Sequence, residues 1–239
     1  MTWPTPADPY EWQEIDGRPA LVCRPLRPFA RHLFTTSDWP LGARHAQSGG
    51  ADAWQDVSHA LAIEPVRLVR GTQVHGHAAI VGTESVRQQE RPQADIAMVR
   101  EPHAAAAVQV ADCVAMLAVD RITGAVVAAH AGWRGLAGGV LENTVRELCG
   151  AAGCEPSEVR AWMGPCIGPQ AFEVGSEVRQ AFVQAHAHSA RHFTAIAERS
   201  GKWWCDLPGL ARERLAACGV GQVWGNDGSS AWCTHSRPE

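Results

Sequence analysis

The sequence has no long apolar run, no cluster of basic residues and few charges overall. No stretch approaches the ~18 consecutive apolar residues that a membrane-spanning helix needs. The N-terminal segment MTWPTPADPYEWQEIDG lacks the basic start and apolar centre of a secretory signal. With 19% charged residues and a formal net charge of -4, the chain offers no basic run for a row of phosphates. We therefore expect a cytoplasmic protein that binds neither membranes nor nucleic acid.

The eight cysteines contain no CxxC pair and follow no regular spacing. A chain of 239 residues with 46% apolar residues can bury a full core without cross-links, so disulfides are not required. We expect reduced thiols, most of them buried as small apolar groups. No repeat or linker-like stretch divides the chain, which predicts one domain over residues 1–239. The oligomeric state stays open between a monomer and a small homo-oligomer.

Alternating apolar runs and amphipathic stretches predict an α+β (mixed α/β) fold, in which mixed β-sheets are covered by helices. We expect one helix to end at Gly150 and another to begin at Asp206 as N-cap and to end at Gly219. Helical spacing appears at 54–62, 136–148 and 175–188, and again after residue 206. Apolar runs lie at 21–23, 31–36, 66–69, 96–99, 105–110, 114–119, 125–129 and 160–163.

Three segments place reactive side chains at the ends of expected strands: GTQVHGH at 71–77, VADCV at 110–114 and VAAHAGWRG at 127–135. Catalytic groups often lie at such edges. Because side chains alternate along a strand, Cys113 and Asp112 are expected on opposite faces. This makes Cys113 the candidate metal ligand and Asp112 a supporting residue.

The same alternation places Gln73, His75 and His77 on one face, so the residues alone do not choose between the two histidines. With Cys113 and His130, either histidine would complete a zinc site with three protein ligands and an open fourth position. Such a zinc ion brings the pKa of a water ligand to about 7, which suits hydrolytic deamination. Each histidine taken singly is more often structural, and the spacing matches no local zinc motif.

A glycine-rich turn, AGWRGLAGG at 131–139, leads into an expected helix. Glycines let the backbone approach a ligand, and the N–H groups of a helix N-terminus then face it. Arg134 would complete an anion site for inorganic phosphate, the nucleophile of a phosphorolysis. The alternatives are tight packing of the turn and an ordinary surface ion pair for Arg134.

The segment MGPCIGPQAFEVG at 163–175 has two Gly-Pro pairs that stiffen a loop ahead of an expected helix. Phe172 could stack on a base, and Glu173 could transfer protons. Alternatively, Phe172 belongs to the core, and Glu173 supports the helix N-terminus electrostatically.

An ordered set of motifs resembles the laccase-domain family, first described as multicopper polyphenol oxidases and later as purine nucleoside phosphorylases with adenosine deaminase activity. The resemblance implies that His75, Cys113 and His130 are the metal ligands, which decides against His77. It implies zinc, with copper for oxidase activity. The matching stretches are TQVHG at 72–76, ADC at 111–113, HAGWRG at 130–135, GPCIGPQAFEVG at 164–175 and CDLPGLARERLAACGV at 205–220.

The resemblance also implies the reactions. These are phosphorolysis of purine nucleosides and of methylthioadenosine, and deamination of adenosine to inosine. In this interpretation Arg134 and Gly135 hold the phosphate, Glu173 moves a proton, and Gln73 and Phe172 contact the substrate. The expected partners are therefore purine nucleosides and inorganic phosphate.

Three departures from the family pattern stand out. Residues 32–47 only partly reproduce the family's N-terminal region, Phe172 replaces a tyrosine common in relatives, and the chain ends at CTHSRPE where relatives continue. The last departure leaves open a truncated C-terminus or a pocket that lacks a part.

Three rival functions remain open. A copper polyphenol oxidase would need many histidine ligands, often in HxH pairs, and His75 with His77 is the one such pair near the site. A metal-free hydrolase would use Cys113 as nucleophile and His130 as base. A non-catalytic binding module would keep the zinc for stability only.

Overall fold

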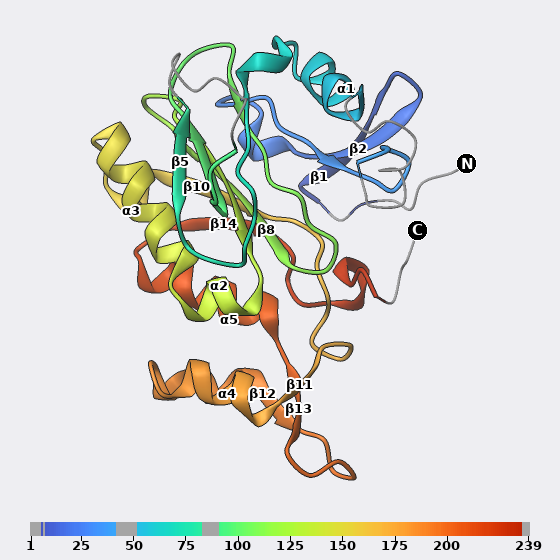
Figure 1. Ribbon diagram of the computed structural model, residues 1–239, viewed down its shortest axis with the longest axis vertical. Helices are drawn as coiled ribbons and strands as arrows, with labels where there is room; N and C mark the ends of the chain where they lie inside the picture. The colour runs from blue at the N-terminus through green and yellow to red at the C-terminus, as the bar shows by residue number, and fades with distance from the viewer. Residues whose placement is uncertain (1–5, 7, 42–51, 83–90, 236–239) are drawn as a thin grey trace.

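The structure, a computed structural model, describes residues 6, 8–41, 52–82 and 91–235 (Figure 1). Its centre is a six-stranded sheet with the strand order β14-β10-β8-β9-β6-β5. The outer pairs are parallel and the inner pairs antiparallel, so the sheet is mixed. Its strands are β5 (Ala79–Gly82), β6 (Ile96–Val99), β8 (Val114–Asp120), β9 (Val126–Ala131), β10 (Val159–Met163) and β14 (Gln222–Gly225).

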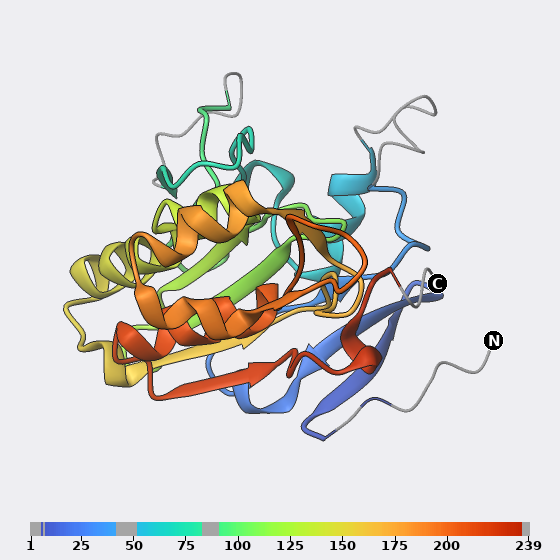
Figure 2. The same cartoon turned by 90° about the horizontal axis from the view of Figure 1, so that it is seen from below.

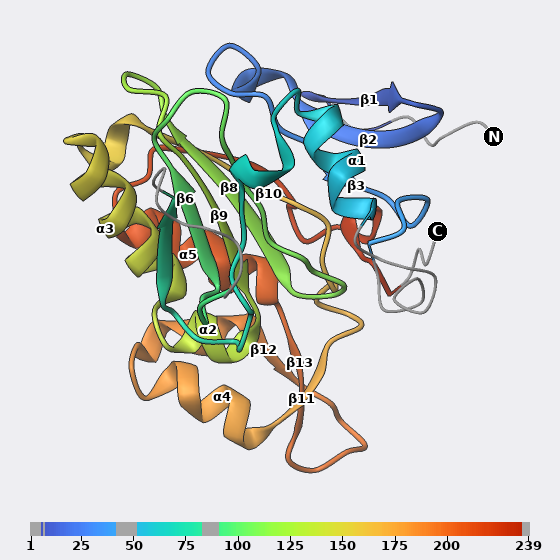
Figure 3. The same cartoon turned by 45° about the horizontal axis from the view of Figure 1, so that its top comes forward.

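The two faces of the central sheet are covered differently, as Figures 2 and 3 show. Helices α3 (Val140–Ala152), α4 (Ser176–Val183) and α5 (Leu207–Ala217) share one apolar core with the sheet. The other face packs against the N-terminal sheet of β1 (Tyr10–Ile15), β2 (Arg18–Cys23) and β3 (Phe34–Thr35). Burial on both faces explains the continuous apolar runs of the inner strands. The α+β prediction is confirmed.

Gly138 and Gly139 divide the helix predicted after Gly135 into two helices. α2 (Trp133–Ala137) ends before Gly138, and α3 begins after Gly139, whose φ of 87° lies in the left-handed region. The predicted end at Gly150 is wrong, because α3 continues to Gly153, where φ is 70° and the N–H bonds to the Cys149 carbonyl. A C-terminal glycine is favoured because it adopts this conformation without a Cβ clash.

Three other helices were predicted, and the structure confirms the one after Asp206 and shifts or shortens the other two. Asp206 caps α5 as predicted, because its side chain accepts a 2.9 Å hydrogen bond from Gly209 N–H, and Gly219 follows the helix with φ 86°. The helix expected over 175–188 is shorter: α4 ends at Val183, and a 3-10 helix follows at Ala187–His192. The helix predicted at 54–62 is α1 (Asp52–Ala60).

Two small sheets complete the described fold. β4 (Leu68–Val69) pairs with β7 (Ala105–Ala106), and a second sheet has the order β11-β13-β12. The strand predicted over 105–110 is therefore too long. The strands of the second sheet are β11 (Glu173–Gly175), β12 (Phe193–Ala195) and β13 (Lys202–Cys205).

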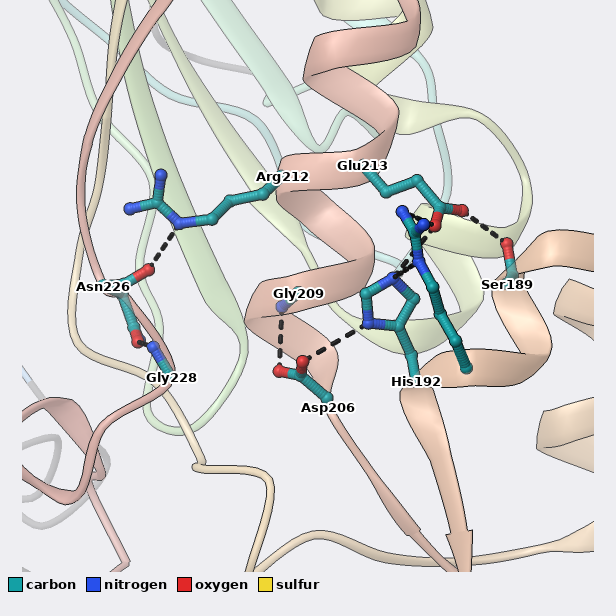
Figure 4. Close-up of polar contacts among 9 residues, drawn as sticks. Ser189, His192, Asp206, Gly209, Arg212, Glu213, Asn226 and Gly228 are labelled. Carbon is teal, nitrogen blue, oxygen red and sulfur yellow. Dashed lines mark hydrogen bonds and ion pairs between the residues drawn. The ribbon is translucent and has the colours of Figure 1, made fainter.

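A polar network joins the 3-10 helix Ala187–His192 to α5 (Figure 4). His192 bridges two carboxylates, with Nδ1 3.3 Å from Asp206 Oδ2 and Nε2 2.9 Å from Glu213 Oε2. Glu213 also accepts a 2.7 Å hydrogen bond from the Ser189 hydroxyl and pairs with Arg191 at 2.8 Å. Through His192 the network links the 3-10 helix to the N-cap of α5, Asp206, and to Glu213 farther along that helix.

Among the described residues, none of the helices has the length and apolar character that crossing a membrane requires.

Candidate metal centre

His75, Cys113 and His130 come together at one end of the central sheet. Their candidate ligand atoms all lie within 4.8 Å of one another, and Cys113 Sγ is 4.0 Å from His75 Nε2. His75 is exposed, Cys113 is half-buried and His130 is buried. The cluster is therefore anchored in the core and open to solvent on the His75 side.

Strand pairing brings the three segments together. Cys113 lies directly before β8, and His130 belongs to β9, whose register pairs His130 with Ala115. On the other side of β9, the His130 N–H donates to the Asp95 carbonyl at 2.8 Å, which fixes the start of β6 beside it. The His75 loop then packs against Asp95, so all three groups converge at adjacent strand ends.

Asp95 connects two of these groups. It is fully buried, and its Oδ1 lies 2.7 Å from His130 Nδ1. Its two oxygens also accept backbone hydrogen bonds from Val74, His75 and Gly76 at 3.1, 3.0 and 2.8 Å. Burial alone would raise the pKa of Asp95, but the hydrogen bonds from His130 and the backbone lower it below the ordinary value. Asp95 is thus an ionised carboxylate that only accepts.

His130 is held as a neutral imidazole. Burial lowers its pKa, and the Asp95 hydrogen bond opposes that effect without overcoming it. Since Asp95 is ionised, the hydrogen between the two groups belongs to Nδ1, which leaves the lone pair of Nε2 available to a metal. The rings of His75 and His130 meet edge to face, with centroids 4.7 Å apart.

The backbone of His75 is in the left-handed region, with φ 59°. A residue with a Cβ seldom adopts this conformation outside sites where the surroundings enforce it. Here three consecutive N–H groups point at the Asp95 carboxylate and enforce it. This conformation turns the His75 ring toward Cys113.

The surroundings of Cys113 favour a cation. Burial raises the pKa of its thiol, and the carboxylates of Asp112 and Asp95 raise it further. A nucleophilic cysteine needs a neighbour that lowers the thiol pKa, whereas a metal ion deprotonates a coordinating thiol outright. The electrostatics therefore fit a metal ligand better than a free nucleophile.

The donor set fits zinc. A tetrahedral zinc with ordinary Zn–S and Zn–N bond lengths separates sulfur and nitrogen by about 3.6 Å, close to the Cys113–His75 distance. One thiolate and two imidazoles are ligands that zinc accepts, and copper accepts them too. The three residues could thus hold a metal ion.

Gly132 makes room for the cluster. A Cβ at this position would lie 2.7 Å from His75 Cδ2 and 2.9 Å from Cys113 Sγ, closer than such atoms approach. Gly132 therefore lets α2 begin directly against the two side chains. Gly135 has a related packing role, because a Cβ there would lie 2.8 Å from the Gly76 carbonyl oxygen.

The alternative ligand His77 and the supporting residue Asp112 are not members of the cluster. The His77 carbonyl accepts a 2.6 Å hydrogen bond from Asn143 Nδ2. The Asp112 carboxylate accepts a 2.6 Å hydrogen bond from the Thr234 hydroxyl. Asp112 thus affects Cys113 through its charge, and its side chain is anchored to the C-terminal segment.

Two predicted substrate-binding residues have structural contacts. Gln73 exchanges two 2.7 Å hydrogen bonds with the backbone of Gln109, which fastens the His75 loop to the chain leading to Cys113. Arg134 is exposed in α2, and its guanidinium lies 4.3 Å from the centroid of the Trp133 ring. Arg134 stands two residues after Gly132, so it is near the cluster in the chain.

Phe172 and Glu173 lie at the start of the second sheet. Phe172 packs against the main core, and the Cys205 N–H donates to its carbonyl at 2.9 Å. The Glu173 carboxylate pairs with Arg199 and, at 3.6 Å, with Lys202. These contacts hold Glu173 in the β11–β13 pair, and it is not a member of the His75 cluster.

An open cavity of about 1210 Å³ lies between the N-terminal sheet and the central sheet. Its lining includes Asp112 and Thr234, but not the three residues of the cluster. The cavity and the cluster are therefore distinct, although Asp112 of the cavity lining directly precedes Cys113 in the chain.

Sequence reasoning missed Asp95 and Gly132. The signal for Asp95 was a single acidic residue directly before four buried apolar residues, a place where a charge needs a partner. The signal for Gly132 was its position between His130 and the helix, but the neighbours of a Cβ at this position are set by the folded arrangement of the His75 and Cys113 segments.

Fold and cluster together define a class: a mixed-sheet α+β protein with a Cys/His2 cluster at a sheet end that could hold a metal ion. Residues 41–239 match the family described as multi-copper polyphenol oxidoreductase laccase, and the chain belongs to this family. It is 42% identical over 175 residues to purine nucleoside phosphorylase YfiH of Escherichia coli (strain K12), covering 73% of this chain and 67% of that protein. It is 39% identical over 113 residues to adenosine deaminase RL5 of an unknown prokaryotic organism, covering 47% of this chain and 42% of that protein.

Solved structures agree with the fold. The Neisseria meningitidis protein NMB0706 superposes with a TM-score of 0.73 at 31% identity, covering 95% of this chain and 88% of that one. The Bacillus licheniformis protein YfiH gives a TM-score of 0.82 at 22% identity, covering 95% of this chain and 90% of that one. The second likeness concerns the fold alone.

Proposed function

We propose that the protein is a zinc-dependent purine nucleoside phosphorylase that also deaminates adenosine and phosphorolyses methylthioadenosine. The observation that carries the proposal is the convergence of His75, Cys113 and His130 within 4.8 Å. Relatives named purine nucleoside phosphorylase and adenosine deaminase support the substrate class. We place the protein in the cytoplasm, as the composition predicts, and take residues 1–239 as one domain.

The chain's own residues prepare the site. The Asp95 carboxylate keeps the His130 Nε2 lone pair available, and the left-handed backbone of His75 turns its ring to the same point. His75, Cys113 and His130 would hold the zinc ion, which would supply Lewis acidity at this point when bound. The exposed His75 side gives substrates access.

Phosphate binding is assigned to Arg134 with Gly135. Arg134 is exposed in the first turn of α2, two residues after Gly132, where an added Cβ would meet His75 and Cys113. Its guanidinium is free to form paired hydrogen bonds with a phosphate, a geometry that arginine provides and lysine does not. In this assignment the phosphate lies between α2 and the ligand cluster.

Base recognition and proton transfer are assigned to the loop 164–175 and to Gln73. Phe172 would stack on the purine, and Glu173 would move the proton to or from the base. Gln73 would act mainly by fixing the His75 loop, because its side-chain nitrogen donates to the Gln109 carbonyl and its side-chain oxygen accepts from the Gln109 N–H. Glu173→Gln tests the proton transfer: turnover should fall while zinc content stays the same.

Products distinguish the activities directly. Zinc-loaded protein is incubated with adenosine, with and without phosphate, and the products are separated by chromatography. Adenine with ribose 1-phosphate that depends on phosphate indicates phosphorolysis, and inosine indicates deamination. Cys113→Ala is the matched control, and it should lose zinc and both products together. Full turnover by metal-free protein would instead indicate the Cys-His hydrolase.

A copper polyphenol oxidase is the second candidate. The family description and the soft sulfur of Cys113 favour it, because a Cys/His2 set also accepts copper. Phenol oxidation that appears only after copper loading, without nucleoside turnover in the zinc form, would select this function.

A further inference from the structure

Asp95 stands directly before β6, and its side chain is fully buried at the sheet end. Its carboxylate is the one group that contacts both the His130 ring and the backbone of His75 among the described contacts. A buried carboxylate needs hydrogen-bond partners, but burial does not require that two of them belong to histidines of the same cluster.

We propose that Asp95 is a positioning residue that sets both histidine ligands at once: it fixes His130 with Nε2 free, and it holds His75 in the left-handed conformation. The inference rests on the metal site of the proposed function. It concerns how the ligands are oriented and is independent of the nucleoside.

The first arm acts on the His130 ring. The 2.7 Å contact between Nδ1 and Asp95 Oδ1 places the ring proton on Nδ1, because both Asp95 oxygens already accept backbone N–H groups and the ring nitrogen is the donor of this pair. The backbone repeats the link, since the His130 N–H donates to the Asp95 carbonyl at 2.8 Å. Ring and backbone of His130 are thus both fixed by one residue.

The second arm acts on the His75 loop. The N–H groups of Val74, His75 and Gly76 reach the carboxylate at 3.1, 3.0 and 2.8 Å. Three such bonds compensate for the strained φ of 59° at His75. Without the carboxylate the loop is expected to relax, and the His75 ring would leave the point that faces Cys113.

Two variants weaken the arms in steps. Asp95→Asn keeps one oxygen for the Val74 and Gly76 N–H groups but can present an NH₂ group at the position of Oδ1, which would move the His130 ring proton to Nε2 and remove the acceptor of the His75 N–H. Asp95→Ala removes both arms. Asp120→Asn is the matched control, because Asp120 is equally buried and accepts from Thr123 N and Oγ1 at 2.6 Å, at the opposite end of β8.

Zinc affinity of the full chain, measured by competition with a chelator, is the first readout. We expect a loss of about 10- to 100-fold for Asp95→Asn and a larger loss for Asp95→Ala. Asp120→Asn should lower the melting temperature and leave zinc affinity unchanged. Zinc affinity in a folded Asp95→Asn protein equal to that of the wild type would overturn the proposal.

Nitrogen NMR of the metal-free wild-type protein is the second readout, and it needs no folded Asp95 variant. The His130 signals, identified by their loss in His130→Gln, should show a protonated Nδ1 and a bare Nε2. A proton on Nε2 would contradict the proposal. Neither readout uses a nucleoside, so absence of turnover would count against the proposed function and leave this inference standing.

Discussion

Two histidines of this chain, His130 and the partly buried His192, contact carboxylates and have pKa values shifted in opposite directions. His130 contacts Asp95, and its pKa is lowered, first by burial. His192 contacts Asp206 and Glu213, and its pKa is raised, first by the hydrogen bond with Asp206. The environment of His130 favours the neutral form, which can bind a metal, whereas the environment of His192 favours the charged form, which joins two elements.

The number and kind of neighbours account for this difference. One carboxylate does not offset the burial of His130, and the interaction with the nearby His75 lowers the pKa of His130 further. Two carboxylates do offset the burial of His192, whose side chain also keeps 12% exposure. A buried His–Asp contact therefore does not by itself identify a metal ligand or a salt bridge.

Removing the imidazole of His130 or of His192 should affect different properties, zinc affinity in the first case and stability in the second. We expect the loss of zinc affinity to be the largest effect. His130→Ala should lower zinc affinity by more than the ~10- to 100-fold that follows loss of a supporting partner, with turnover lost in parallel. His192→Ala should keep one zinc per chain and normal turnover while its stability falls. Metal analysis, kinetics and thermal unfolding of both proteins check this, and a zinc-free His192→Ala would contradict it.

Gly132→Ala should disturb the cluster of His75, Cys113 and His130 and leave the His192 network unchanged. The added Cβ would meet His75 and Cys113 below 3.0 Å, so zinc affinity should fall about 10-fold or more, comparable to loss of a supporting residue. Gly150→Ala is the control, because nothing lies within 4 Å of its Cβ and it is interior to α3. That control should keep zinc and gain about 0.5–1 kcal/mol of stability. Equal zinc affinities for the two variants would remove the steric role of Gly132.

His192→Gln should destabilise the protein by about 2 kcal/mol, because a hydrogen-bonded charge is lost. The pKa of His192 is raised above its ordinary 6.5, so its contribution is fully present below pH 6.5 and is lost as the pH rises through the raised value. Burial would raise the pKa of Glu213, but the hydrogen bonds from Ser189 and His192 lower it below 4.5, so that contribution is lost only in more acidic solution. Urea unfolding at several pH values should therefore show the largest wild-type advantage between about pH 4.5 and 6.5. A difference independent of pH would mean that His192 is not the cation of this network.

The smallest effects concern one arginine from each region. Arg134→Ala should raise the KM for phosphate about 10-fold, the loss of roughly one charged hydrogen bond. Arg191→Ala removes a partly exposed partner of Glu213 and should cost less than about 1 kcal/mol with no change in phosphate dependence. Phosphate titrations of both variants are the measurement, and an unchanged KM in Arg134→Ala would remove its assigned role.

The central strands were predictable because they are buried on both faces. β6 and β8 coincide with the apolar runs at 96–99 and 114–119, with one further residue in β8. By contrast β1 and β13 were not expected, because their polar and half-exposed residues become strands only through their pairing partners. The Gly138–Gly139 pair likewise determines where α2 stops, which helical periodicity does not reveal.

The site was predictable only in part. Residue chemistry and strand ends indicated Cys113 and His130, and the family resemblance selected His75 over His77. The Asp95 contact could not be foreseen, because it depends on a loop that returns to the sheet end with a left-handed residue. Long-range contacts of this kind leave no spacing pattern in a single sequence.

Anomalous diffraction at the zinc absorption edge, from crystals of the zinc-loaded protein, tests the metal site most directly. We expect one peak, bonded to His75 Nε2, Cys113 Sγ and His130 Nε2. A zinc peak elsewhere, with no density among these three atoms, would contradict the assignment of the metal centre.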